Sequence, residues 1–81
     1  MIIRFFGKLR ETISPQVEID VPDPAFTVAR LRAYLGEIYP AAAEELASPR
    51  VKAAIDDEVV DDETMLDGVQ MIDFFPPVSG G

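Results

Sequence analysis

One segment of this 81-residue chain has the apolar spacing of a helix that could cover a sheet, and strand-like segments flank it on both sides. Four apolar residues follow one another at spacings of three, four and three, and so share one helical face: Val28, Leu31, Leu35 and Ile38. Thr27 is expected to cap this helix, because its hydroxyl can accept a hydrogen bond from a free amide of the first turn. Pro40 is expected to end it. Arg30 and Arg32, elsewhere on the helix, are expected to be surface charges rather than a site.

The strand segments complete a single small domain. They alternate apolar and polar residues, or are short apolar runs, over 2–6, 17–21, 51–55, 59–60 and 70–75. Residues 7–16 contain Gly and Pro and are expected to form a loop, 41–47 a short second helix, and 56–58 and 67–68 turns. The predicted fold is α+β, with one main helix on a mixed sheet and the first and last strands side by side in its middle. This is the β-grasp arrangement of ubiquitin-like proteins.

The alternation also predicts which side chains face the helix. Phe5 and Phe74 fall on the core-facing parity, so Phe6 and Phe75 are expected to point away from the helix. If the first and last strands are parallel neighbours, Arg4 and Asp73 form an exposed pair of little energetic value on that same outer face. Two aromatic side chains on adjacent strands, Phe6 and Phe75, are then more consistent with an anchor for a partner than with two idle surface residues.

Composition excludes several kinds of function. The chain has no cysteine and no histidine, so it lacks a thiolate nucleophile, the commonest general base and the usual zinc ligands. Its net charge of −8 disfavours nucleic acid and favours a basic partner surface. The acidic runs 56–58 and 61–63 lack the ligand spacing of a calcium loop, so we expect solvated turns and no metal site. Neither a signal peptide nor a membrane span is expected, which makes the cytoplasm the expected location.

The chain finishes in a Pro-Pro-Val-Ser-Gly-Gly run. We therefore expect a β-grasp domain over residues 1–75 and an extended tail over 76–81. Pro76 and Pro77 give the tail a stiff base, and the five residues from Pro77 onward can reach about 16 Å. Pro77, Val78, Ser79 and Gly80 are expected to thread a partner's channel, where a glycine without Cβ needs the least room.

The carboxylate of Gly81 is the expected reactive group. A peptide carboxylate is inert until adenylation by ATP converts it to a mixed anhydride, which a sulfur donor or a cysteine thiolate can then attack. The product is a C-terminal thiocarboxylate or a thioester. This chain contains no cysteine that could divert the intermediate.

These residues resemble a known family. The run Phe74-Phe75-Pro76-Pro77-Val78-Ser79-Gly80-Gly81 looks like the terminal signature of the small, sulfur-carrying subunit of molybdopterin synthase, and Ile3 to Glu11, Val51 to Ile55 and Leu66 to Gly68 also fit. The resemblance spans the whole chain, and its terminal eight residues are the most specific part.

The resemblance implies a function and partners. Gly81 would carry sulfur as a thiocarboxylate after adenylation by a ubiquitin-activating-like enzyme that uses ATP and a sulfur donor. The tail would then enter the large subunit, in a heterotetramer of two small and two large subunits, which converts cyclic pyranopterin monophosphate to molybdopterin. The small subunit would have no catalytic side chains and no permanently bound cofactor. Val59 would join Phe6 and Phe75 in the partner-binding patch. Asp56 and Val69 depart from the residues usual in the family.

Three alternatives remain open at this point. A thiamine-type sulfur carrier shares the fold and the Gly-Gly end, although it usually lacks the Phe-Phe-Pro-Pro run. A protein modifier that forms an isopeptide bond to lysine begins with the same chemistry. A non-covalent β-grasp binding module would not need Gly81 at all, so truncation of that residue separates it from the carriers.

Overall fold

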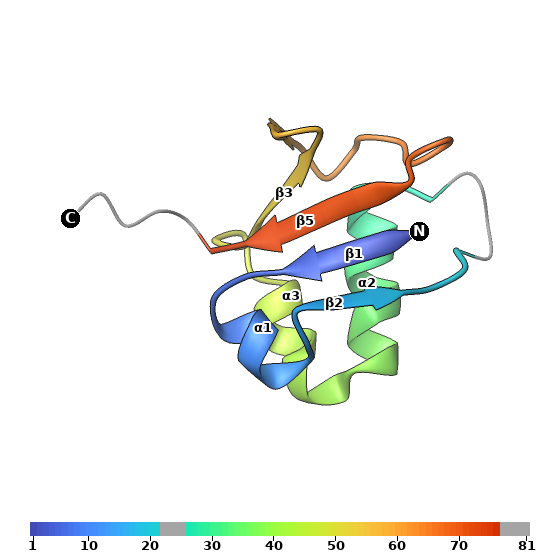
Figure 1. Ribbon diagram of the computed structural model, residues 1–81. Helices are drawn as coiled ribbons and strands as arrows, with labels where there is room; N and C mark the ends of the chain where they lie inside the picture. Colours follow the sequence, from blue (N-terminus) through green and yellow to red (C-terminus); the bar gives the residue numbers. More distant parts are fainter. Residues whose placement is uncertain (22–25, 77–81) are drawn as a thin grey trace.

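The sheet of this protein has its first and last strands at its centre. The computed structural model describes residues 1–21 and 26–76. The strands are β1 (Ile2–Phe5), β2 (Gln16–Glu18), β3 (Lys52–Ile55), β4 (Glu58–Val60) and β5 (Met71–Phe75). Their order across the sheet is β2-β1-β5-β3-β4. In Figure 1, β1 and β5 run side by side in the same direction. The predicted ubiquitin-like β-grasp fold is therefore confirmed.

Three short pairings complete the sheet around this parallel pair. β1 pairs antiparallel with β2, while β3 pairs antiparallel with both β4 and β5. Across the parallel pair, Arg4 lies opposite Asp73 and Phe5 opposite Phe74. This is the register that the alternating sequence pattern predicted, and it places each pair on one face of the sheet.

The helices all lie on one side of the sheet, behind and below it in Figure 1. They are α1 (Lys8–Thr12), α2 (Val28–Ile38), the 3-10 helix η1 (Pro40–Ala42) and α3 (Ala43–Leu46). The Thr27 side chain accepts a hydrogen bond from the Arg30 amide at 3.2 Å, as a helix cap should. The other side of the sheet carries no helix among the described residues.

The core forms between the sheet and these helices. Its largest fully buried side chains come from both layers: Phe5, Phe74, Ile3, Leu9, Leu31, Leu35, Leu46, Ile72 and Val28. The Phe5 and Phe74 rings stack with centroids 6.3 Å apart. Both aromatics that were assigned to the core are buried, which confirms the predicted facing of β1 and β5.

One prediction about local structure is wrong. Residues 7–16 do not form only a loop, because 8–12 make the helix α1, with Leu9 buried in the core. The residues of α1 are adequate helix formers and Leu9 supplies the apolar contact, while the Gly and Pro merely flank the helix. Of the four apolar residues that share one face of α2, Val28, Leu31 and Leu35 are buried, and Ile38 is not. It is the last residue of that helix, where the chain turns into η1, and it stays 41% exposed.

The turn between β3 and β4 forms where it was predicted, and it uses two aspartates. Asp56 and Asp57 have φ of 51° and 66°. A two-residue hairpin with positive φ at both positions matches the twist of the flanking strands, and Asp tolerates this region better than most residues. The acidic run therefore shapes the hairpin.

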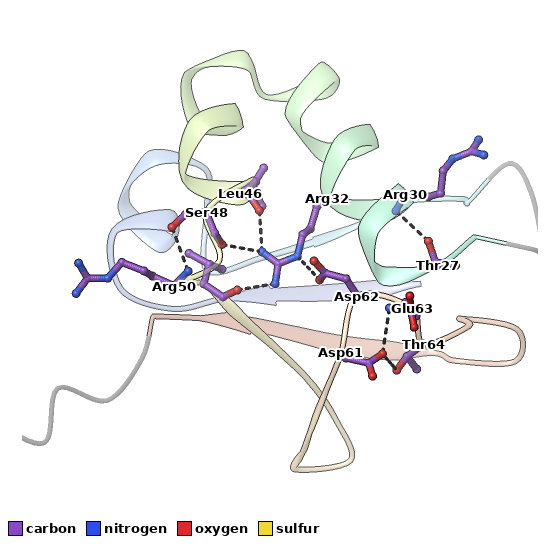
Figure 2. Close-up of polar contacts among 11 residues, drawn as sticks. Thr27, Arg30, Arg32, Leu46, Ser48, Arg50, Asp61, Asp62, Glu63 and Thr64 are labelled. Atoms are coloured by element: carbon purple, nitrogen blue, oxygen red, sulfur yellow. Dashed lines mark hydrogen bonds and ion pairs between the residues drawn. The ribbon is translucent and has the colours of Figure 1, made fainter.

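Arg32 was expected to be a surface charge, and this prediction is wrong. Its side chain is only 10% exposed, and its guanidinium lies between α2 and the segments that follow α3 and β4 (Figure 2). It donates to the carbonyls of Leu46, at 2.8 Å, and of Ser48 and Val51, and to the Asp62 carboxylate at 2.9 Å. A planar guanidinium with five donors suits this convergence of acceptors. Arg32 therefore ties the chain around α3 and β3 to the main helix.

Replacement of Arg32 by alanine should destabilise the domain by about 2–3 kcal/mol, because several partly buried acceptors lose a charged donor. Arg30→Ala is the matched control, since Arg30 is an exposed arginine on the same helix whose guanidinium lies over the Phe26 ring, 4.9 Å from its centroid, and not on backbone carbonyls. The control should change the free energy of unfolding by less than about 1 kcal/mol. Urea unfolding of both variants checks this, and equal effects would show that Arg32 is not an anchor.

Candidate functional site

The helix-free face of the sheet brings together the three residues assigned to partner binding. Phe6, Val59 and Phe75 line one shallow hollow of about 290 Å³, together with Ala54, Asp57 and Asp73. Phe6 is 38% and Val59 64% exposed, while Phe75 is half-buried. We call these three side chains the docking face. They come from segments far apart in the sequence, and only the sheet order makes them neighbours.

Backbone pairing fixes each member of the docking face. Phe75 is the last residue of β5, and the Phe6 amide donates to the Phe74 carbonyl at 3.0 Å, which continues the pairing past the end of β1. Val59 pairs with Ala54, which pairs on its other side with Asp73. Because these contacts are between backbones, the docking face is preformed.

Ala54 is a contributor that sequence reasoning missed. It is buried although it lies on the outer face, opposite in parity to the core residue Ala53. On this face it lies between Val59 and Asp73, its partners on the two neighbouring strands, and its small side chain lines the hollow. The available signal was a small apolar residue at an outward position between two strands with large outward residues.

A charged pair borders the apolar hollow. Arg4 donates to both carboxylate oxygens of Asp73, at 2.6 and 2.8 Å, as the strand register predicted. These hydrogen bonds, then the charge of Asp73, raise the pKa of Arg4 above its ordinary value. The Arg4 guanidinium also lies over the Phe6 ring, 5.9 Å from its centroid. Arg4 therefore pairs with Asp73 and also helps to hold Phe6 at the rim.

The hairpin that borders the hollow is acidic, while Lys52, opposite Phe75 on β3, adds one basic side chain to the same face. Asp57 lines the hollow, and Asp56 and Glu58 are its exposed neighbours on the hairpin that carries Val59. An apolar centre with an acidic border matches a partner with an apolar patch and a basic border. The net charge of −8 acts in the same direction.

The C-terminal segment that was predicted to be reactive follows directly after this face in the sequence. Pro76 follows Phe75 directly and is the last described residue of this segment. The predicted tail-threading residues Pro77, Val78, Ser79 and Gly80, and the predicted reactive residue Gly81, lie outside the described residues. Their assignments stay predictions, as does the domain boundary after residue 75.

The carboxylates of Asp61 and Asp62, in the acidic run 61–63, take part in local hydrogen bonds and an ion pair. One Asp61 oxygen accepts from the Glu63 amide at 3.0 Å and from the Thr64 hydroxyl at 3.1 Å, and Asp62 pairs with Arg32 (Figure 2). Within residues 1–21 and 26–76, no group of three or more acidic side chains is arranged to hold a metal ion. Over the same residues, none of the helices has the length and apolar character needed to cross a bilayer.

Comparison with known proteins relates this geometry to a family. The ThiS family profile matches residues 3–81. The fold is similar to that of small archaeal modifier protein 1 from Haloferax volcanii, with a TM-score of 0.81 and 24% identity, over 99% of this chain and 97% of that one. A Pyrococcus furiosus protein described as molybdopterin converting factor, subunit 1, gives 0.77 at 22% identity over 95% of each chain. The HVO 2177 protein of Haloferax volcanii gives 0.77 at 28% identity, over 99% of this chain and 84% of that one. No curated protein sequence matches significantly.

The opposite orientations of Phe74 and Phe75 predict opposite mutational effects. Phe74→Ala should cost about 3–5 kcal/mol of stability, because a fully buried ring leaves a cavity. Phe75→Ala should cost roughly 1 kcal/mol, because its ring is half-buried on the outer face. Thermal melts of the two variants measure the difference. A larger loss for Phe75→Ala would mean that the two faces of β5 are reversed.

Proposed function

The chain belongs to the ThiS family of ubiquitin-like β-grasp sulfur carriers, and from that premise we propose that it is the sulfur-donating small subunit of a molybdopterin synthase. The observation that carries the proposal is the docking face. Phe6, Val59 and Phe75 line one hollow on the helix-free side of the sheet, and Phe75 leads directly into the Pro-Pro-Val-Ser-Gly-Gly run. An aromatic anchor that directly precedes a reactive tail in the sequence would allow one partner to hold the domain and receive the tail.

The sequence of the last eight residues supports the molybdopterin assignment over other sulfur carriers. Phe74-Phe75-Pro76-Pro77-Val78-Ser79-Gly80-Gly81 resembles the terminal signature of that small subunit. Thiamine-type carriers usually lack the Phe-Phe-Pro-Pro part. The structural likeness to the Pyrococcus furiosus converting-factor subunit agrees with the proposal at the level of fold.

The proposed chemistry needs two displacement steps on Gly81. A carboxylate oxygen of Gly81 attacks the α-phosphate of ATP on the activating enzyme, and pyrophosphate leaves. Hydrosulfide released by the sulfur donor then attacks the carbonyl carbon of the mixed anhydride, AMP leaves with the original oxygen, and the thiocarboxylate remains. In the large subunit the thiocarboxylate sulfur would attack a carbon of the pterin precursor and displace an oxygen substituent from it. Water would then hydrolyse the C–S bond to Gly81, which restores the carboxylate and leaves the sulfur on the pterin.

The side chains of this protein present the tail and do not react. The chain has no cysteine or histidine that could capture the adenylate from within. Its docking face provides binding energy remote from the reacting atoms, which an enzyme can use to orient the terminus. Its acidic border accelerates association with a basic partner surface. The large subunit and the activating enzyme are the partners that this arrangement suits.

A protein-modifier role is the second candidate. The specific observation in its favour is the likeness to small archaeal modifier protein 1, with a TM-score of 0.81. A modifier begins with the same adenylate, but a lysine amine then attacks the carbonyl carbon and forms an isopeptide bond. Both roles need Gly81, and they differ in the product: sulfur on the terminus or a conjugate of larger mass.

Deletion of Gly81 should abolish loading with sulfur and leave stability unchanged. We would co-express the chain with an activating enzyme and a sulfur source, and measure its intact mass. Wild type should gain the mass difference between one sulfur and one oxygen, and the truncated chain should gain none. The loaded chain should then support molybdopterin formation by the large subunit from cyclic pyranopterin monophosphate.

The same experiment separates the alternatives. Loading without molybdopterin formation, but with transfer to the acceptor of thiamine synthesis, would assign the thiamine role. Lysine conjugates without a loaded terminus would assign the modifier role. Wild-type function in a chain without Gly81 would leave only the non-covalent binding module.

Phe75→Ala should weaken binding to the large subunit by about 2 kcal/mol, roughly 30-fold in Kd, if Phe75 anchors the docking face. Val59→Ala should act in the same direction. Ile38→Ala is the control, because Ile38 is a similarly exposed apolar side chain on the helical side of the domain. Calorimetric titrations measure all three. If Ile38→Ala lowered the affinity for the large subunit as much as Phe75→Ala does, the docking surface would have to lie on the helical side of the domain.

A further inference from the structure

Gly7 lies at a junction held from three directions. The amide of the preceding Phe6 donates to the Phe74 carbonyl at 3.0 Å, which ties this point of the chain to β5. The Gly7 carbonyl accepts from the Arg10 amide at 3.1 Å, which begins α1. Leu9, two residues on, is buried in the core. Gly7 is therefore a fixed point of the domain next to the place where β5 ends.

The conformation of Gly7 is one that residues with a side chain avoid. Its φ is 67° and its ψ is −140°. Only glycine adopts such a combination readily. The sequence reasoning counted Gly7 only as a loop residue and gave it no part in function.

The Pro76 ring packs directly against the bare Cα of Gly7. A Cβ placed on Gly7 would lie 2.7 Å from Cγ and 3.0 Å from Cδ of Pro76, too close for either to stay in position. By contrast, the Pro76 Cβ would be 3.7 Å away, an ordinary contact. The contact therefore depends on the two ring carbons that distinguish proline from alanine.

Pro76 is well suited to set the direction of the backbone that follows it. Its ring fixes its own φ, and because Pro77 follows, the helical region is disfavoured for its ψ. On another side Pro76 borders a hollow of about 480 Å³ that Lys8, Thr12 and Arg50 also line. That hollow offers room to a ring displaced from Gly7.

We propose that Gly7 is a positioning residue for sulfur transfer: its bare Cα seats Pro76 and so sets the direction in which the reactive tail leaves the domain. This inference rests on the proposed function, since it concerns the delivery of Gly81 to an enzyme. Docking and aiming then belong to different residues. The docking face holds the partner, and the Gly7–Pro76 contact decides where the terminus points once the partner is bound.

Separate residues for the two tasks give separate kinetic effects. Misplacement of a reacting group by about 1 Å can cost 10²-fold in rate without weakening binding. Loss of the Gly7–Pro76 contact should therefore lower kcat for thiocarboxylate formation and leave KM for the carrier nearly unchanged. Loss of Phe75 should raise KM and largely preserve kcat.

The experiment compares Gly7→Ala, Pro76→Ala and the double variant with wild type and Phe75→Ala. Each is assayed with the activating enzyme, ATP and a sulfur source, and the rate of thiocarboxylate formation is followed by intact mass. We expect kcat to fall about 10-fold or more for each single variant, with KM within roughly 2-fold of wild type. The double variant should be no slower than the slower single variant, because both substitutions remove the same contact.

Unfolding measurements separate positioning from backbone strain. An alanine at position 7 is strained by its positive φ in either background, but it meets the ring carbons only when residue 76 is proline. Gly7→Ala should therefore destabilise the wild-type domain more than it destabilises a domain that already carries Pro76→Ala. If Gly7→Ala does not fold, Pro76→Ala still tests the inference, because it removes the ring without placing a side chain at the strained position.

The outcomes distinguish this inference from the function beneath it. If wild type is not loaded by any activating enzyme, the sulfur-carrier proposal fails and the inference falls with it. If wild type is loaded and Pro76→Ala matches its kcat, the carrier role stands and the positioning role of Gly7 is wrong. Additive effects of the two substitutions on kcat would also overturn it.

Discussion

The parallel pairing of β1 with β5 is the constraint on which the rest of the structure depends. It joins residues that are 69 positions apart in the sequence, as in the pair Arg4 and Asp73, and it places both strands inside the sheet. Successive residues of β5 then serve different ends: Ile72 and Phe74 complete the core, while Asp73 and Phe75 face outward. A shift of one residue would exchange the two sets. Core packing therefore also fixes the orientation of the docking face.

A second, polar constraint holds the helical layer to this sheet. α3 is only one turn long, and the segment that follows it passes close to α2 before β3 begins. Short helices have little stability of their own, so this segment depends on tertiary contacts. The Arg32 guanidinium supplies them to three carbonyls and to Asp62, and it also lies over the Phe74 ring, 5.4 Å from its centroid. Arg32 thus contacts the core face of β5, and the opposite face of β5 lines the hollow between Phe6, Val59 and Phe75.

Most of the fold and part of the site could be predicted from the alternation of apolar and polar residues along the strands. This alternation predicted the facing of Phe5 and Phe74, the Arg4–Asp73 pair and the outward positions of Phe6 and Phe75. Arg32 could not be assigned in this way, because its acceptors are backbone carbonyls, which any sequence contains. Ala54 gives no signal until both neighbouring strands are known. The sequence shows a glycine at position 7, but the contact that requires it, with the ring of Pro76, cannot be predicted until the fold is known.

The place of β5 in the chain also has a consequence for biosynthesis. A growing chain leaves the ribosome from its N-terminus, and β5 is the last of the five strands to appear. Until it does, β1 lacks its parallel neighbour and β3 lacks one of its two partners, so the sheet cannot assemble around its central strand. A prematurely terminated chain that ends before Met71 therefore lacks both a completed fold and a complete docking face. The topology thus makes the surface proposed to bind a partner appear only in chains that are long enough to complete the sheet.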